Sequence, residues 1–267
     1  MLAYQLLHAP KTRTRKDYPF VVAVTPEVPS NVRDRLKKDG ATIVEVEHLT
    51  PGWIADKVEE RYSDVMTKMR IASWTQYDLV LILDLDTVLT DNIDGVFDIE
   101  EARVLDNLHL EYEGENDAVK EDEGPQPEKY VFAGVSGLAG NHAFPPKEEE
   151  RMRNGPGYWA NAGFFIIKPT QELYDHYLTV MEIPHRFDGG WPEEGLLNYV
   201  HRPGGNMPWL HLDNIWNTPF AWKGDLDAGV RSLHRKWWAE SGGLEDYMHQ
   251  IRWQMDGWFR AMDQMKG

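Results

Sequence analysis

The strongest constraint on the fold of this chain is an apolar run that ends on two aspartates. Leu79–Leu83 consists of large apolar residues with no helical period, and so predicts a short buried strand. Asp84 and Asp86 follow it directly, one residue apart. Carboxylates lose hydration at the end of a buried strand, and two of them repel each other. A divalent cation that bridges these oxygens to a phosphate would compensate for both effects.

The composition of the chain excludes several classes of function. Its 267 residues include 28 Lys and Arg against 44 Asp and Glu, which gives a net charge of -16. A protein that binds the backbone of DNA or RNA needs a basic face, so we expect no nucleic acid partner. A single nucleotide held through a metal stays compatible with this charge. The lack of cysteine excludes disulfides and thiolate chemistry, and no apolar run reaches the roughly 20 residues of a membrane span.

Short apolar runs that alternate with helical patterns predict an α/β fold. Phe20–Val24 and Ala41–Val46 are predicted strands around a helix that opens at Ser30, a unit whose length favours parallel pairing. Further strands are predicted at Tyr130–Val135 and Phe164–Ile167. The apolar periodicity predicts helices at residues 1–9, Trp53–Thr75, Gln171–Met181, from Pro192 onward, and Leu244–Met265.

We expect one large domain over residues 1–240, followed by an amphipathic helix over 241–267 that packs on it. Docking of that helix on a partner or a membrane surface is the alternative. Residues 111–128 contain eight Asp and Glu among polar, Gly and Pro residues. This composition predicts a solvated and mobile loop, which is either a plain insertion or a substrate lid.

Polar residues on two other elements are candidates for the same site. Lys68 lies on the predicted helix that leads into the apolar strand, although an ordinary solvated lysine is the alternative. Asn161 and Gly163 stand at the entrance of the strand Phe164–Ile167. Glycine lets the backbone approach a ligand closely, and the asparagine could hydrogen-bond a polar substrate there. The same Asn-Ala-Gly sequence also forms ordinary turns.

Two glutamates and a late histidine complete the list of candidates. Glu193 and Glu194 open a helix, where carboxylates favour its positive end and capping alone would explain them. His234 is either a metal ligand or a structural histidine. Two aspartates and one imidazole form a ligand set suited to Mn²⁺ or Mg²⁺, with the other positions left to phosphate oxygens. The metal would stabilise a diphosphate leaving group, which fits sugar transfer from a nucleotide sugar.

The ordered set of motifs resembles family 8 of the retaining glycosyltransferases, which includes glycogenin and galactinol synthase. The resemblance starts in Lys68–Asp98, continues through Asn161–Gly163, Glu194–Asn198 and His234, and covers about residues 1–240. It implies a Rossmann-like nucleotide-diphospho-sugar transferase fold of the GT-A type, with a mixed, mainly parallel central sheet. It also implies metal-dependent, retaining transfer of a hexose from a UDP-sugar. The acceptor, whether a sugar, a polyol or a protein, is not identified by these motifs.

The resemblance assigns the metal and the diphosphate of the donor to particular residues. Asp84, Asp86 and His234 match the metal-binding residues, and Asp84 would also reach the donor ribose. Lys68 matches a lysine that contacts the donor phosphate or sugar. Lys236 stands where a lysine neutralises the diphosphate. The implied cofactor is Mn²⁺ or Mg²⁺, with the UDP-sugar as donor substrate.

The resemblance also assigns the donor sugar and the catalytic groups. Asn161 and Gly163 match the loop that holds the donor sugar. Glu193 or Glu194 would stabilise positive charge at the anomeric carbon, with Lys68 as the third catalytic candidate, and we assign neither glutamate as a covalent nucleophile. Glu193 and Glu194 stand where the family has Asp-Gln, which is a departure of this sequence from the family pattern.

The family's first strand, which carries the residues that hold uracil and ribose, would precede Met1. We therefore expect the chain to begin in the helix that follows it. This departure motivates an alternative, a catalytically impaired transferase-like binding protein. A metal-dependent phosphohydrolase is a second alternative, because paired aspartates after a strand also occur in that class. A homodimer stays open, and so does the compartment: the cytoplasm is the default, and the Golgi lumen applies if a segment precedes the chain.

Overall fold

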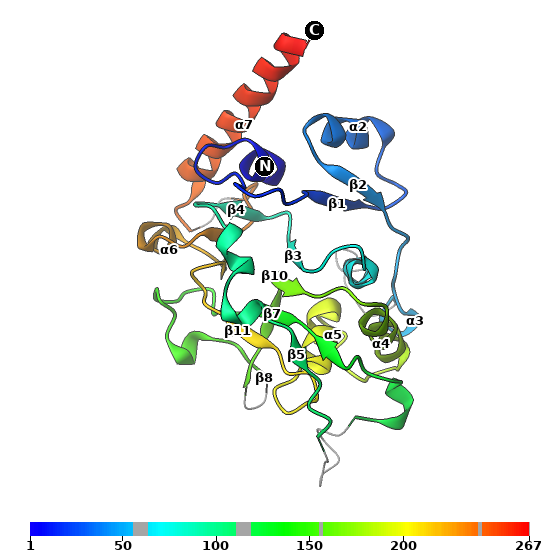
Figure 1. The fold of residues 1–267 in the computed structure, drawn as a ribbon. Coiled ribbons are helices and arrows are strands. Elements are labelled where there is room, and N and C mark those ends of the chain that lie inside the picture. Colours follow the sequence, from blue (N-terminus) through cyan, green and yellow to red (C-terminus); the bar gives the residue numbers. More distant parts are fainter. Residues whose placement is uncertain (56–63, 111–118, 155–156, 240–241, 267) are drawn as a thin grey trace.

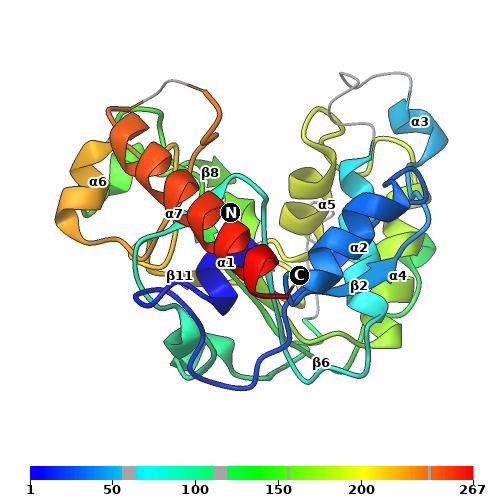
Figure 2. The same ribbon diagram turned by 90° about the horizontal axis from the view of Figure 1, so that it is seen from above.

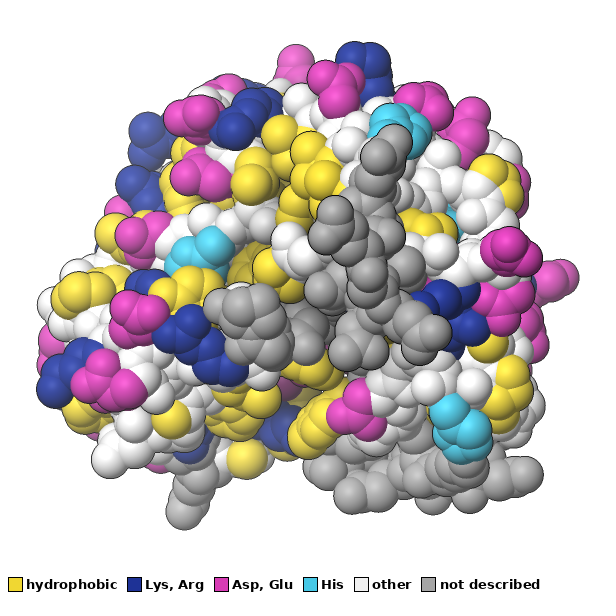
Figure 3. Space-filling view, turned by 90° about the horizontal axis from the view of Figure 1, so that it is seen from below, with side chains coloured by type: hydrophobic (Ala, Val, Ile, Leu, Met, Phe, Trp, Pro, Cys, Tyr) yellow, Lys and Arg dark blue, Asp and Glu magenta, His cyan; other side chains and the backbone are white. Residues whose placement is uncertain are grey.

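A computed structural model describes residues 1–55, 64–110, 119–154, 157–239 and 242–266 of the chain. Short strands and helices alternate along the described residues (Figure 1), so the predicted α/β class is confirmed. Acidic and basic side chains are interspersed over the face shown in Figure 3, and the net negative charge is not gathered there into one large patch.

The first unit of the fold is the predicted strand–helix–strand. β1 (Val21–Val24) and β2 (Thr42–Glu45) pair in parallel, and α2 (Ser30–Lys38) connects them. Gly40, with a φ of 105°, follows the end of α2 as expected for a residue that leaves a helix in the left-handed region. The parallel pairing predicted for this unit is confirmed.

The central sheet has four strands in the order β11-β7-β10-β3. β11 runs parallel to β7, whereas β10 is antiparallel to both β7 and β3. β3, β7 and β11 therefore run in one direction and only β10 runs against them, so the predicted mixed, mainly parallel sheet is confirmed. The connection between β7 and β10 explains why these two strands are antiparallel. Its described residues form only a short 3-10 turn and the hairpin β8–β9, whereas parallel neighbours would need a crossover connection, usually a helix. The bounds are β3 Val80–Leu83, β7 Phe132–Ser136, β8 Arg153–Asn154, β9 Gly157–Tyr158, β10 Ala160–Ile167 and β11 Leu210–Leu212.

A second sheet adjoins the end of β3 and has the order β12-β13-β4. β4 (Thr87–Leu89) is antiparallel to β13 (Ser232–His234), and β13 is parallel to β12 (Thr218–Pro219). Asp84 and Asp86 therefore lie in the short connection by which the chain leaves the central sheet and enters the second one. The remaining strands, β5 (Leu105–Asp106) and β6 (Lys129–Tyr130), form a separate short antiparallel pair.

Apolar side chains cover both faces of the central sheet. One face packs against α4, α5 and the 3-10 helix η2, and the other packs against α1 and the turns η3 and η4. Thr170 caps α4 through a 3.1 Å hydrogen bond from the backbone N–H of Leu173 to its hydroxyl. The bounds are α1 Leu2–Leu7, α4 Gln171–Glu182, α5 Pro192–Val200, α6 Lys223–Ala228, η2 Val65–Ser73, η3 Asp94–Phe97, η4 Glu100–Ala102 and η6 Glu148–Glu150.

The helix predicted over Trp53–Thr75 differs from the observed structure. α3 spans only Gly52–Ala55, and η2 is a 3-10 helix rather than an α-helix. Residues 56–63 of the predicted helix lie outside the described residues. Met66, Met69 and Ala72 are buried at a spacing of three residues, which is the period of a 3-10 helix, so the apolar pattern alone did not separate the two forms.

One acid of the predicted acidic loop, Glu123, is buried in the structure. Residues 119–128 contain η5 (Glu121–Glu123), in which the side chain of Glu123 is only 1% exposed. Arg186 pairs with this carboxylate and Tyr199 donates a hydrogen bond to it, while Arg186 also contacts Asp122 at 2.8 Å. Glu121, Asp122 and Glu128 are exposed, so burial departs from the expected solvation only at Glu123, which partners far along the chain hold. The prediction of a loop over the whole segment stays a prediction. Residues 111–118 lie outside the described residues.

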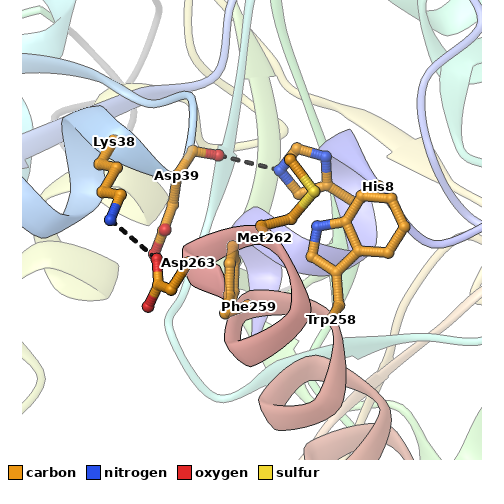
Figure 4. A pocket seen from close by; sticks show the side chains of 7 residues that line it. All are labelled: His8, Lys38, Asp39, Trp258, Phe259, Met262 and Asp263. Atoms are coloured by element: carbon orange, nitrogen blue, oxygen red, sulfur yellow. Dashed lines mark hydrogen bonds and ion pairs between the residues drawn. The ribbon is translucent and has the colours of Figure 1, made fainter. Parts of the chain in front are cut away.

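The C-terminal helix α7 (Glu245–Lys266) passes over α1 and reaches α2 (Figures 1 and 2). Trp258 stacks on His8, and Asp263 pairs with Lys38 at 2.8 Å (Figure 4). The open pocket that these and neighbouring residues line measures about 40 Å³, which suits a few water molecules and not a nucleotide. The division into a domain and an appended helix stays a prediction. None of the helices within the described ranges has the length and apolarity needed to cross a bilayer.

Candidate active site

Asp84, Asp86 and His234 meet at the junction of the two sheets. His234 Nε2 lies 3.1 Å from Asp86 Oδ1 and 3.7 Å from Asp84 Oδ2. One candidate ligand atom from each residue lies within 4.8 Å of the other two, and no other such group of acidic and histidine side chains occurs in the described parts of the chain. The structure thus brings together the three residues that the sequence grouped. Their role as metal ligands stays a prediction.

The backbone fixes this convergence. His234 on β13 lies opposite Thr87 on β4, one residue after Asp86. Arg235 donates its backbone N–H to the carbonyl of Asp86 at 2.9 Å, and Asp84 donates its own to the carbonyl of Gly163 at 2.9 Å. The two aspartates are therefore tied to β13 on one side and to β10 on the other.

Asp86 and His234 each stabilise the charged form of the other, and Asp84 adds to this effect on His234. Burial opposes ionisation of Asp86, but its hydrogen bond to His234 holds the pKa of this carboxyl below its ordinary value. Burial also opposes protonation of His234, whereas Asp86 and Asp84 raise the pKa of the imidazole. Two carboxylates and an imidazole supply oxygen and nitrogen donors of the kind that Mn²⁺ and Mg²⁺ accept, so the side chains present fit such an ion.

Lys68 extends the cluster toward the helix α5. Its Nζ donates to Asp84 Oδ1 at 2.8 Å and to the carbonyl of Ala162 at 2.9 Å, and it lies 3.8 Å from Glu193 Oε1. Burial alone would lower the pKa of this amine, yet the pKa is raised, because Asp84 and Glu193 lie beside it. The alternative of an ordinary solvated lysine is therefore wrong.

The two glutamates of α5 occupy different environments. Glu193 is 13% exposed, and burial raises the pKa of its carboxyl despite the nearby charge of Lys68. Glu194 is hydrogen-bonded to the segment that enters β10: Trp159 Nε1 donates to Oε2 at 2.9 Å, and Asn161 Nδ2 donates to Oε1 at 2.7 Å. Helix capping alone does not describe either residue, because α5 has no side-chain cap bond at its first turn.

The structure explains why a glycine occupies position 163, which the sequence did not reveal. A Cβ at this position would lie 2.1 Å from His234 Cε1 and 2.6 Å from His234 Nδ1. Only glycine leaves room for the imidazole, so the close approach here is made by a side chain of the protein itself. The prediction that Gly163 holds the donor sugar stays untested.

Lys236 lies on the surface just after β13. Its charge reaches Asp86 and contributes to the lowered pKa of that carboxyl. It therefore borders the Asp–Asp–His cluster, in keeping with the predicted contact to a diphosphate, which stays a prediction.

Sequence reasoning missed two side chains that shape this site. Trp159 supplies the indole N–H that reaches Glu194. Asn198 accepts from the backbone N–H of Ala160 and donates to its carbonyl, both at 2.8 Å. The sequence included Asn198 only as the last residue of the Glu194–Asn198 motif and gave it no role, and its burial shows only in the structure. Trp159 gave no signal, because a tryptophan before a strand is as often part of a core.

The mixed α/β fold and the Asp–Asp–His cluster are compatible with a glycosyltransferase-like protein, and the comparisons of sequence support this class. No protein-family model matches the chain. An uncharacterised protein of Schizosaccharomyces pombe is 27% identical over 263 residues, which is 89% of this chain and 66% of that protein. Galactinol synthase 1 of Solanum lycopersicum is 24% identical over 222 residues, which is 78% of this chain and 59% of the enzyme.

Galactinol synthases of Arabidopsis thaliana match over a similar share of the chain. The resemblance to family 8 of the glycosyltransferases is therefore confirmed, and this chain is similar to the galactinol synthases over most of its length. It spans about 60% of the length of these enzymes. Among solved structures, the glycosyltransferase GlyE of Streptococcus pneumoniae is 16% identical with a TM-score of 0.47, over 88% of this chain and 54% of that one.

Proposed function

We propose that this protein is a metal-dependent retaining glycosyltransferase that moves a hexose from a UDP-sugar to an unidentified acceptor. The observation that carries the proposal is the meeting of Asp84, Asp86 and His234 with Lys68 at one edge of the central sheet. The relatives named galactinol synthase support the class of reaction.

In this proposal Asp84, Asp86 and His234 would hold Mn²⁺ or Mg²⁺. When bound, the ion would supply positive charge to a diphosphate leaving group. Lys68, which a 2.8 Å hydrogen bond holds beside Asp84, would supply a second positive charge to the diphosphate. Lys236 adds a third from the surface side of Asp86. Charge on the departing diphosphate is thus met by groups that are fixed before the substrate arrives, which is the main requirement for electrostatic catalysis.

Glu193 is the carboxylate best placed to act on the sugar itself. It lies 3.8 Å from Lys68 Nζ and faces the cluster from the first turn of α5. A negative charge there would stabilise positive charge that develops at the anomeric carbon when the bond to the diphosphate breaks. We assign it this electrostatic role and no covalent one.

The test is a screen of UDP-sugars for Mn²⁺-dependent release of UDP. We expect wild-type protein to hydrolyse or transfer one of them slowly, and Asp86→Asn to abolish this activity. Asp98→Asn is the matched control, because Asp98 is an exposed aspartate that pairs only with Lys16 in the described structure. Full activity in excess EDTA would contradict the proposal. Hydrolysis of simple phosphate esters without any nucleotide would instead favour the phosphohydrolase alternative.

A further inference from the structure

The carboxylate of Glu194 is surrounded by hydrogen-bond donors only. Oε2 accepts from Trp159 Nε1 at 2.9 Å. Oε1 accepts from Asn161 Nδ2 at 2.7 Å and from the backbone N–H of Ala162 at 3.1 Å. A carboxylate has no proton to donate, so it satisfies all three groups at once.

These bonds fix the orientation of the Asn161 side chain. Its Nδ2 must face the carboxylate of Glu194, while its Oδ1 accepts from the backbone N–H of Gly163 at 3.0 Å. A flipped amide would place two donors against the Gly163 N–H and an acceptor against the Glu194 carboxylate. The amide of Asn161 therefore has one defined orientation, and one N–H of Nδ2 is left after its bond to Glu194.

The segment of residues 159–163 is also hydrogen-bonded to Lys68 and Asp84, on the side of the Asp–Asp–His cluster. Lys68 donates to the carbonyl of Ala162 at 2.9 Å, and Asp84 donates its backbone N–H to the carbonyl of Gly163 at 2.9 Å. On the helix side, the amide of Asn198 forms two hydrogen bonds with the backbone of Ala160. Residues 159–163 thus bridge α5 and the aspartates, and a change at Glu194 would be transmitted along this bridge.

We propose that Glu194 is a positioning residue that holds Trp159, Asn161 and Ala162 as the floor of the donor-sugar subsite, and that it is not a catalytic group. The assignment of a donor-sugar subsite rests on the proposed function. The clamp, by which we mean the three hydrogen bonds that Glu194 accepts from Trp159, Asn161 and Ala162, does not rest on it. A glutamine at position 194 would not serve here, because its NH₂ group would face at least one of the three donors. The amide oxygen of a glutamine could accept from Asn161 and Ala162, but no acceptor would then remain for the indole N–H of Trp159. A carboxylate offers an acceptor oxygen to all three donors. This differs from the catalytic role expected from the sequence, which stays with Glu193.

The clamp is tested by a double-variant cycle in urea unfolding, with Glu194→Gln, Trp159→Phe and the combination. We expect Glu194→Gln to raise the unfolding equilibrium constant roughly tenfold, because a partly buried donor loses its acceptor. On the Trp159→Phe background the same change has a smaller effect, since the glutamine NH₂ then faces no N–H. Additive effects of the two changes would overturn the clamp. Glu172→Gln is the matched control, because Glu172 is an exposed glutamate in the first turn of α4.

The positioning role is tested by steady-state kinetics with the UDP-sugar found active. We expect Glu194→Gln to raise the KM for the donor about tenfold with a smaller loss in kcat, and Trp159→Phe to restore part of that KM in the combined variant. A fall in kcat of about a thousandfold or more that Trp159→Phe does not rescue would overturn the positioning role and indicate a catalytic one. If wild-type protein turns over no UDP-sugar, the proposed function and the subsite assignment fail together, while the unfolding cycle still decides the clamp.

Discussion

Replacing Gly163 by alanine should disturb the proposed metal site without altering any of its ligands. The new Cβ would lie 2.1 Å from His234 Cε1, whereas ordinary contacts begin at about 3.4 Å, so the imidazole must move by the difference, about 1.3 Å. His234 cannot shift freely, because β13 pairs on both sides, with β4 and with β12. We expect a loss of unfolding free energy of about 1–3 kcal/mol from overpacking. We also expect Mn²⁺ affinity to fall about 10- to 100-fold, as for other changes that displace a ligand from its support.

The assay combines urea unfolding with calorimetric titration of Mn²⁺ in the presence of UDP. Gly140→Ala is the control, because a Cβ at Gly140 would meet nothing within 4 Å and its backbone conformation is open to alanine. If Gly163→Ala matched wild type in both stability and Mn²⁺ affinity, the close packing of Gly163 against His234 would be refuted. A loss of stability with unchanged Mn²⁺ affinity would refute the assignment of His234 as a ligand.

Three further predictions concern the stability of the fold. Glu123→Gln should lower the free energy of unfolding by about 3–5 kcal/mol, because it leaves Arg186 without its buried charge partner; an unchanged urea midpoint would contradict this. Burial opposes protonation of His142, but its hydrogen bond to Asp225 raises its pKa, so the stability from this pair is full below about pH 6.5 and falls as pH rises through the raised value. Urea midpoints from pH 5 to 9 should show this fall, and His142→Gln should flatten it. Gly257→Ala should stabilise α7 by about 0.5–1 kcal/mol, because a Cβ there meets nothing within 4 Å, and a lower melting temperature would count against it.

The sequence predicted the residues of the cluster because the relevant signal is local. The apolar strand that ends at Asp84 is visible within a few residues, and the order of the motifs allowed His234 to be added by resemblance. The structure places the two in contact through the pairing of β4 with β13. Elements with a clear periodicity, such as α4 and the β1–α2–β2 unit, were predicted for the same reason.

Features that depend on a distant partner could not be predicted in this way. The acidic composition around Glu123 indicates solvation, and nothing nearby shows that Arg186 and Tyr199 will bury it. The three donors of Glu194 likewise come from a segment more than 30 residues earlier. Charge and periodicity describe a residue and its neighbours, whereas a buried carboxylate is decided by which partners the tertiary fold brings to it.

The most direct test of the central claim is a calorimetric titration of UDP into the protein with and without Mn²⁺. The proposed site predicts that UDP binds in the presence of Mn²⁺, that excess EDTA removes this binding, and that Asp86→Asn and His234→Ala each abolish it while Asp98→Asn does not. UDP binding of equal affinity in EDTA, or in the Asp86→Asn variant with Mn²⁺, would contradict a nucleotide-sugar site built on Asp84, Asp86 and His234.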